Sequence, residues 1–253
     1  MKKLLRFLKR LVYFCAAGAG IYFTGMWINH WVHNSDTFLV THVEVEGAKL
    51  LSEENILALV KLEPNVRIFD IDVAPYIDMV KSNPYVEKVS IGKKLPQTIK
   101  IDLEERVPVA IIDLYKDCLT DKNGYLLPKL KNIAYLAELP VITGVSLDNP
   151  KTGEKSEDEP LIKSLDFINI LNEEIPFFSN SISEIHYENE EISVYLSDHG
   201  TMIKFGEDGY SLKIQKLIYF LEHYQKQNEI SNLIYIDLNY KDQIVVREVN
   251  SGQ

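Results

Sequence analysis

Cysteine is scarce in this chain: only Cys15 and Cys118 carry a thiol among 253 residues. Cys15 lies inside an apolar run, so we expect no intramolecular disulfide, and the chain has to fold without cross-links. A disulfide scaffold and a cysteine-rich zinc site are therefore excluded. The composition also lacks the bias of disordered, collagenous or low-complexity chains, because 46% of the residues are hydrophobic and 25% are charged.

Basic residues are scarce beyond the N-terminus. Five of the 27 Lys and Arg residues lie within residues 1–32, which contain no acid: Lys2, Lys3, Arg6, Lys9 and Arg10. The remainder of the chain carries 22 basic against 37 acidic residues, a net charge of −15. Phosphate contacts need a basic surface, so no nucleic-acid partner is expected.

Common catalytic and metal-binding motifs are missing as well. The chain has no G-x-S-x-G elbow, P-loop or G-x-G-x-x-G, and none of its six histidines lies in an H-E-x-x-H pattern. Adjacent carboxylates such as Glu104-Glu105 would point to opposite faces of a strand and cannot form a dyad by themselves. We expect no enzyme activity, cofactor or metal. Distant carboxylates can still converge in a fold, which leaves an envelope enzyme acting on peptidoglycan as an alternative.

The apolar stretch Leu11–Val32 spans 22 residues without Lys, Arg, Asp or Glu. As a helix it would measure about 33 Å, enough to cross a hydrocarbon core of about 30 Å. All five early basic residues precede it, so the positive-inside rule predicts a cytoplasmic tail over 1–10 and a body across the membrane. Cleavage as a signal peptide near residues 17–19 is the main alternative, but apolar sequence continues past that site. A lipoprotein fits less well, because Phe14 precedes Cys15 where a small residue is needed.

After a short polar link, the pattern predicts the order strand, helix, helix, strand, strand. Ser52 is the expected N-cap of the first helix, since Glu53 and Glu54 follow it in the first turn. Asp72 can cap the second helix, which has to end before Asn83-Pro84. The expected elements are a strand over 42–46, helices carrying 56–60 and 73–80, a strand over 85–92, a basic turn at 93–96 and a strand over 98–104.

Beyond Pro108 the pattern turns mainly to strands, with two amphipathic helices. The first helix, 161–174, should bury Leu161, Leu165, Ile168 and Leu171, and the second, 211–227, should bury Leu212, Leu217, Phe220 and Leu221. The charged stretch 150–160 reads as a solvated loop, and residues 121–124 are a strong turn signal. Strands are expected at 109–114, 139–144, 182–187 and 192–196. Another strand should end at 205, and the strands 233–240 and 243–249 should form a final hairpin.

The last expected strand, 243–249, is apolar, lacks proline and lies next to the chain end. An edge strand carries unpaired backbone N–H and C=O groups, which either need protection or recruit a partner strand. Two interpretations follow: an edge that recruits a partner, or an ordinary strand paired on both sides.

Several stretches together resemble the FtsQ/DivIB family of bacterial cell-division proteins. They are VEVEG at 43–47, NVRIFDID at 65–72, NPYVEKVSI at 83–91, LPQTIKIDLEERVPVA at 95–110 and YIDLNY at 235–240. The resemblance covers nearly the whole chain and implies an α+β fold with an N-terminal transmembrane helix. A β-α-α-β-β POTRA module would follow, and then a mainly antiparallel β domain with two amphipathic helices. The implied boundaries are 1–10 for the cytoplasmic tail, 11–32 for the transmembrane helix, 38–107 for the POTRA module and 108–250 for the β domain.

The resemblance implies a non-catalytic divisome scaffold in the bacterial plasma (inner) membrane, enriched at the septum. Such a protein would link division proteins by adding a strand of an FtsB/FtsL-type bitopic partner to its C-terminal sheet edge, with no small-molecule substrate and no cofactor. Tyr240 matches a partner-contacting tyrosine, Asp242 lies in the adjoining turn, and Gln243 stands where a glycine is common. The implied edge residues are Ile244, Val246 and Glu248. Because POTRA modules also occur in outer-membrane assembly proteins, an envelope chaperone for outer-membrane or secreted proteins is the alternative.

Overall fold

The computed structural model describes residues 2–62, 66–113, 118–130, 138–147, 150–176, 178–198, 200–224 and 232–248. The chain divides into two compact units. The first unit comprises residues 1–81 and 88–104, and the second unit comprises residues 82–87 and 105–253. Residues 82–87 therefore group with the second unit. They include the start of a strand, Val86–Lys94, that belongs to the expected POTRA module.

The N-terminal helix α1 runs from Lys2 to Asn34. Its 26-residue segment Lys9–Asn34 is long and apolar enough to cross a membrane, and none of the apolar window within it is buried in the protein. A helix that is apolar on all sides and covered by no other element is typical of a membrane span. Since α1 begins at Lys2, the basic residues before the apolar run are helical too.

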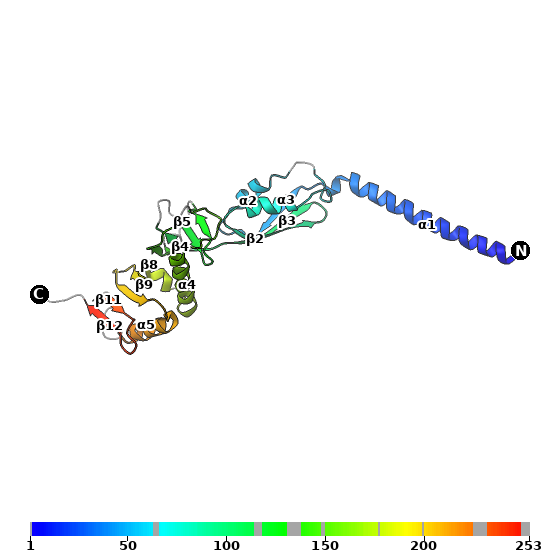
Figure 1. Cartoon of the computed structure of the whole chain (residues 1–253). Helices are drawn as coiled ribbons and strands as arrows, with labels where there is room; N and C mark the ends of the chain where they lie inside the picture. Colours follow the sequence, from blue (N-terminus) through cyan, green and yellow to red (C-terminus); the bar gives the residue numbers. More distant parts are fainter. Residues whose placement is uncertain are drawn as a thin grey trace. The chain divides into compact units, whose positions relative to one another are not determined.

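The first unit continues with the expected order of strands and helices (Figure 1). Ser52 caps α2 as predicted, since its side chain accepts a hydrogen bond from the Asn55 amide. Asp72 accepts a hydrogen bond from the Ala74 amide at the start of α3. The elements are a 3-10 turn η1 (Asp36–Phe38), β1 (His42–Glu46), α2 (Glu53–Val60), α3 (Ala74–Lys81), β2 (Val86–Lys94) and β3 (Thr98–Glu105).

These three strands form a sheet in the order β1-β3-β2, with β1 parallel to β3. Ile99, Ile101 and Leu103 alternate toward the core and are buried, as the period of two predicted. The basic turn predicted at 93–96 begins later, however, because Lys93 and Lys94 still belong to β2. Lys94 Nζ lies 2.8 Å from Glu44 Oε2. Charged residues are common in exposed edge strands. The two lysines therefore belong to the edge strand, and their charge was a poor guide to where the turn begins.

The second unit is built on one nine-stranded sheet, in the order β12-β11-β10-β9-β8-β7-β4-β5-β6. Among the described strands, five neighbouring pairs are antiparallel and three are parallel, which agrees with the expected α+β class. The strands are β4 (Pro108–Ile112), β5 (Cys118–Asp121), β6 (Leu126–Pro128), β7 (Val141–Thr143), β8 (Ile182–Glu188), β9 (Glu191–Leu196), β10 (Met202–Gly206), β11 (Leu233–Asp237) and β12 (Val245–Glu248).

One row of apolar residues crosses this sheet in register. Each member pairs directly with the next, from β4 through β7, β8, β9, β10 and β11 to β12: Ile112, Ile142, Ile185, Val194, Ile203, Ile236 and Val246. Paired residues of neighbouring strands point to the same face. The row therefore defines the core face of the sheet, and a slip of one residue in any strand would turn that strand's apolar set to solvent.

Two helices, α4 (Glu159–Glu174) and α5 (Tyr210–Tyr224), contribute to the same core. The expected face of α4 is confirmed: Leu161, Leu165, Ile168 and Leu171 are all buried. The expected face of α5 is wrong at Leu212, which is 69% exposed, whereas Ile214 is buried. Leu217 lies five positions after Leu212, a rotation that leaves the two side chains about 140° apart, so they cannot share one face. The predicted end of this helix, 225–227, lies outside the described residues, as do His199 and Val249.

The charged stretch before α4 is an exposed loop, as its composition predicted, but its backbone also pairs with the sheet. The Leu126 amide of β6 donates to Glu154 O at 3.0 Å, and the Gly153 amide donates back to Leu126 O at 2.7 Å. The Ser156 amide donates to Gly124 O at 2.9 Å. The stretch thus bonds to the outer side of β6 and covers that edge of the sheet. Charge density alone did not reveal this role, because the bonds use only the backbone.

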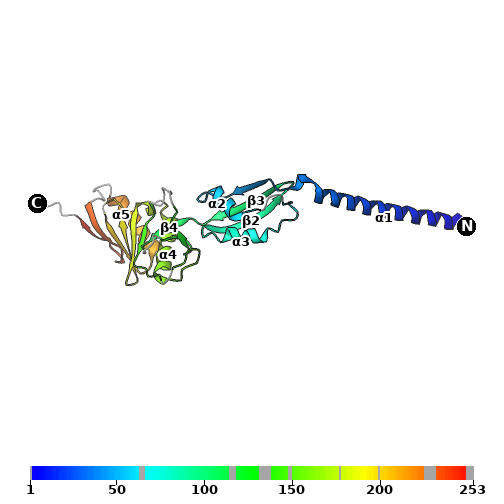
Figure 2. The ribbon, with the colours of Figure 1, turned by 90° about the horizontal axis from the view of Figure 1, so that it is seen from above.

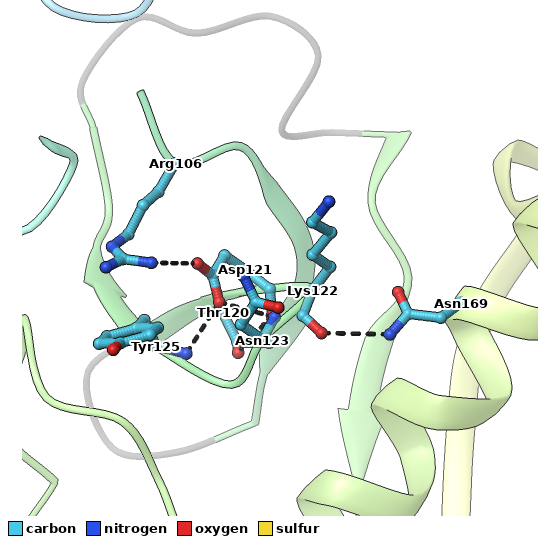
Figure 3. Close-up of polar contacts among 7 residues, drawn as sticks. All are labelled: Arg106, Thr120, Asp121, Lys122, Asn123, Tyr125 and Asn169. Atoms are coloured by element: carbon cyan, nitrogen blue, oxygen red, sulfur yellow. Dashed lines mark hydrogen bonds and ion pairs between the residues drawn. The ribbon is translucent and has the colours of Figure 1, made fainter. Parts of the chain in front are cut away.

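Arg106 forms the most buried ion pair among the described residues (Figure 3). Its Nη1 lies 2.9 Å from Asp121 Oδ2, and the two side chains are only 11% and 3% exposed. The guanidinium also lies 3.5 Å from the centroid of the Tyr125 ring. The other carboxylate oxygen of Asp121 accepts hydrogen bonds from the Asn123 and Tyr125 amides, at 2.9 Å each. The two amide bonds confirm the predicted turn at 121–124. The ion pair joins this turn to Arg106, near the start of the segment 105–253 of the second unit.

We predict that Arg106→Met destabilises the second unit by about 3–5 kcal/mol, because Asp121 would remain buried without its cation. Lys151→Met is the matched control. It removes an exposed lysine that lies 3.5 Å from Glu154, and should cost less than about 1 kcal/mol. Urea unfolding of the full chain in detergent, followed by circular dichroism, measures both changes. Equal losses for the two variants would contradict a structural role for the buried pair.

A second prediction concerns Gly144, which follows β7 with φ +79°. A Cβ there would fall on the Tyr187 carbonyl oxygen of β8. Gly200 also has a positive φ, of +70°, but nothing lies near its missing Cβ. Gly200→Ala should therefore cost about 1 kcal/mol from strain alone. Gly144→Ala should cost a further 1–3 kcal/mol or so from overpacking. The same unfolding experiment compares the two, and an equal cost would show that the β7–β8 contact can relax.

Candidate partner-binding edge

The sheet of the second unit has two ends, and they differ. At one end β6 is bonded to the backbone of residues 153–154. At the other end lies β12, the red strand that closes the row of strands in Figure 2. Among the described residues, no segment is hydrogen-bonded to the outer side of β12. Its outward N–H and C=O groups are therefore free to bind another strand.

Register settles how the side chains of β12 are oriented. Val246 pairs with Ile236 and packs against the core cluster, as Ile244 also does. Val245 and Arg247, which alternate with these residues, lie on the other face of the sheet, where both are exposed. The core side of the strand thus holds β12 in place, while no described residue pairs with its outer backbone edge and the side chains on the opposite face are exposed.

Two lysines of α5 fasten the connection between β11 and β12. Lys216 Nζ donates to the carbonyl oxygens of Tyr240, at 2.9 Å, and of Lys241, at 2.6 Å. Lys213 Nζ donates to the Phe205 carbonyl at 2.6 Å and to Asn239 Oδ1 at 3.1 Å. The connection is therefore ordered by hydrogen bonds to a helix rather than by a tight hairpin turn.

Two tyrosine–carboxylate hydrogen bonds complete the attachment. The Tyr224 hydroxyl donates to Glu248 Oε1 at 2.7 Å, which joins the last turn of α5 to the end of β12. This hydrogen bond, with a smaller contribution from burial, raises the pKa of Tyr224 to about 12. On β11 the Tyr235 hydroxyl donates to Asp237 Oδ2 at 2.6 Å. Burial first, and then this hydrogen bond, raises the pKa of Tyr235 to about 12.

The five residues implied by the resemblance occupy two kinds of position. Tyr240, 48% exposed, and Asp242 lie in the bend before β12, so the predicted strand over 233–240 ends earlier, at Asp237. Ile244 and Val246 are half-buried against the core, and Glu248 is bonded to Tyr224. Sequence reasoning missed Val245 and Arg247, although strict alternation with Val246 would have identified them as its opposite face.

A groove of about 1170 Å³ runs beside this bend. It is lined by α5 and by the residues that connect β11 to β12, including Leu212, Tyr219, Phe220, Asp242 and Ile244. Its lining combines apolar side chains with a few charges, which suits a peptide segment. Within the described part of the chain, no group of three His, Cys, Asp or Glu side chains could hold a metal ion.

An N-terminal membrane span, a β-α-α-β-β unit and a mainly antiparallel β domain define a single-span membrane protein with a POTRA module. Comparisons with known proteins agree with this class. The family model "POTRA domain, FtsQ-type" matches residues 38–106, and the model "FtsQ/DivIB, C-terminal related" matches residues 107–246. The chain belongs to the FtsQ/DivIB family.

Curated relatives are named as cell-division proteins. Cell division protein FtsQ of Geotalea daltonii is 29% identical, over 92% of this chain and 82% of its own length. Cell division protein FtsQ of Geobacter sp. strain M21 is 28% identical, over 97% and 89%. Cell division protein DivIB of Clostridium acetobutylicum is 30% identical, over 81% and 80%. The chain is thus a single-pass membrane protein of the division machinery with a non-catalytic scaffold role, as the resemblance implied.

The Tyr224–Glu248 bond generates a pH prediction. Because the pKa of Tyr224 is raised above its ordinary value of 10.0, the bond stabilises the folded chain below about pH 10, and this contribution is lost as pH rises through about 12. The phenolate absorbance of the wild type minus that of Tyr224→Phe should show one group titrating near 12. A difference curve centred near 10 would mean that the hydroxyl faces water and that β12 is not tied to α5.

Proposed function

We propose that this protein couples membrane-anchored division proteins by adding a strand of an FtsB/FtsL-type bitopic partner to the outer edge of β12. The observation that carries the proposal is the difference between the two ends of the sheet. Residues 153–154 cover β6, whereas β12 has no neighbour beyond β11 among the described residues. Proteins protect or use such edges, and this edge lacks both a cover and a proline.

The packing of β12 supports strand addition. Ile244 and Val246 hold the strand against the core, and Tyr224 ties its end to α5. The edge is therefore ordered before a partner arrives, which lowers the entropy cost of binding. Main-chain hydrogen bonds supply affinity in this mode and tolerate different side chains, including Gln243 where the family commonly has glycine.

Side chains near the edge would set the register of the partner. Tyr240 and Asp242 are exposed in the bend and are the proposed contacts before the strand begins. Val245 and Arg247 are the proposed contacts on the face opposite the core. Alternate residues of an added strand would meet each face in turn. Ile244, Val246 and Glu248 would contribute through their backbone and through the position of the strand.

The proposal includes a topology. Residues 1–10 form the cytoplasmic tail and 11–32 the transmembrane helix, while the POTRA module at 38–107 and the β domain at 108–250 lie outside the cytoplasm, enriched at the septum. The five basic residues before the apolar run support this orientation. Sharing one membrane with its partners raises their effective concentration, so that a modest affinity suffices.

Val246→Pro should abolish recovery of the partner, because proline removes a backbone donor from the edge strand and disturbs its pairing. We expect recovery from detergent-solubilised membranes to fall roughly tenfold or more, since the loss of about 1.4 kcal/mol already gives tenfold. Val246→Ile is the matched control, since it keeps the backbone amide and a β-branched apolar side chain at the same position. Circular dichroism checks that both variants stay folded, and normal recovery with the proline would reject the terminal edge.

A photo-crosslinking amino acid at Val245 in living cells tests which protein is captured. The control position is Lys155, which is exposed beside the covered edge at β6. Capture of a small single-span protein at Val245 alone would support the proposal. Capture of barrel or secreted clients would favour the envelope chaperone instead, and equal capture at both positions would reject β12 as a specific site.

A further inference from the structure

A row of aromatic rings connects the last turns of α1 to the rest of the first unit. The Trp31 ring centroid lies 5.8 Å from that of Phe38, and the Phe38 centroid lies 5.1 Å from that of Phe69. The backbone makes the same connection, since the Ile68 amide donates to Phe38 O at 2.8 Å and the Val40 amide donates to Val66 O at 3.0 Å. The turn at 67–70 is therefore bound to residues 38–40, which directly follow the membrane helix and η1.

The tip of the β2–β3 hairpin belongs to the same end of the first unit. Lys93 Nζ donates to Phe69 O at 3.3 Å, and the Thr41 amide donates to Gln97 O at 3.0 Å. Leu95 lies between Lys93 and Gln97 in the sequence and is 58% exposed. Phe69, whose carbonyl Lys93 binds, is 41% exposed. Two large apolar side chains are thus partly exposed in the segments that contact the residues following the membrane helix.

Bilayer dimensions indicate what covers them. Trp31 lies one residue before the end of the apolar run at Val32, a position typical of the membrane–water interface. The headgroup layer extends about 6 Å beyond the hydrocarbon core on each side. Two ring-to-ring steps, of 5.8 and 5.1 Å, separate Trp31 from Phe69, so the two ring centroids are at most about 11 Å apart. Phe69 and the adjoining hairpin tip therefore lie close to the side of the membrane on which α1 ends.

Charges at this end fit a lipid surface without requiring an anionic one. Lys94 is paired with Glu44 at 2.8 Å, and His33 lies 3.8 Å from Asp70. Lys93 adds a positive charge at the hairpin tip, where its ammonium group donates to Phe69 O. Lysine side chains are common where an apolar surface meets water. Since Lys94 and Asp70 each have a partner of opposite sign nearby, the apolar side chains dominate the expected attraction.

We propose that Phe69 and Leu95, together with Trp31, sit in the phospholipid headgroup layer, so that the first unit rests on the bilayer surface. The membrane helix then does more than tether the chain, because the hairpin tip provides a second point of attachment. This surface is separate from the β12 edge, and the proposal stands or fails independently of strand addition.

The test uses the full chain with Cys15→Ser and Cys118→Ser, reconstituted into phosphatidylcholine vesicles. A nitroxide is attached at Leu95→Cys or, as the matched control, at Glu104→Cys. Glu104 is an exposed residue near the other end of β3, about 20 Å further along the strand. Electron paramagnetic resonance then measures collisions of each label with oxygen, which dissolves in lipid, and with a water-soluble nickel complex.

The label at 95 should collide severalfold less with the nickel complex, and more with oxygen, than the label at 104. The control measures any affinity of the nitroxide itself for lipid. Phe69→Ser in the chain labelled at 95 should raise nickel collisions toward the control value, because the ring that links the tip to Phe38 is gone. Equal collision rates at 95 and 104 would overturn the proposal, since the tip would then stand clear in water. A Phe69→Ser variant that leaves immersion unchanged would reject the role of the aromatic row.

Discussion

The unpaired backbone at the outer side of β12 is the constraint on which the second unit depends. An open sheet of nine strands has two ends, and hydrogen-bonding groups at each end need a partner or water. The chain satisfies one end itself, through the backbone bonds between Leu126 and residues 153–154. At the other end, none of the residues that the structure describes bonds to the outer side of β12. The apolar row that starts at Ile112 finishes at Val246, so the core holds the last strand while its outer side has no described neighbour.

An open edge serves recognition only if it is ordered. In this protein the order comes from α5, whose Lys216 binds the carbonyls of the bend and whose Tyr224 binds Glu248 at the far end of the strand. A four-residue strand without these contacts would fray, because few ladder bonds hold it. The helix therefore contributes twice, through Ile214 and Leu217 in the core and through polar groups that position the edge. A scaffold needs this kind of geometry rather than a reactive group.

Much of the architecture could be read from local patterns. The alternation at 98–104, the N-cap at Ser52, the buried face of α4 and the turn at Asp121 all correspond to the structure, since each depends on residues close in sequence. Errors arose where periodicity was read too broadly. Leu212 faces solvent because Ile214 and Leu217 determine the inner side of α5. Lys93 and Lys94 extend a strand because an edge accepts charge.

Hydropathy and spacing along the chain were enough to predict the membrane span, the order of strands and helices, the α+β class and the apolar residues of the final strand. Three features could be seen only in the folded chain. Residues 153–154 cover β6, Val246 faces the core whereas Val245 does not, and β12 lies at the end of the sheet. These outcomes depend on backbone pairing between segments distant in sequence. Backbone groups are alike in nearly every residue, so side-chain patterns do not reveal which of them find a partner.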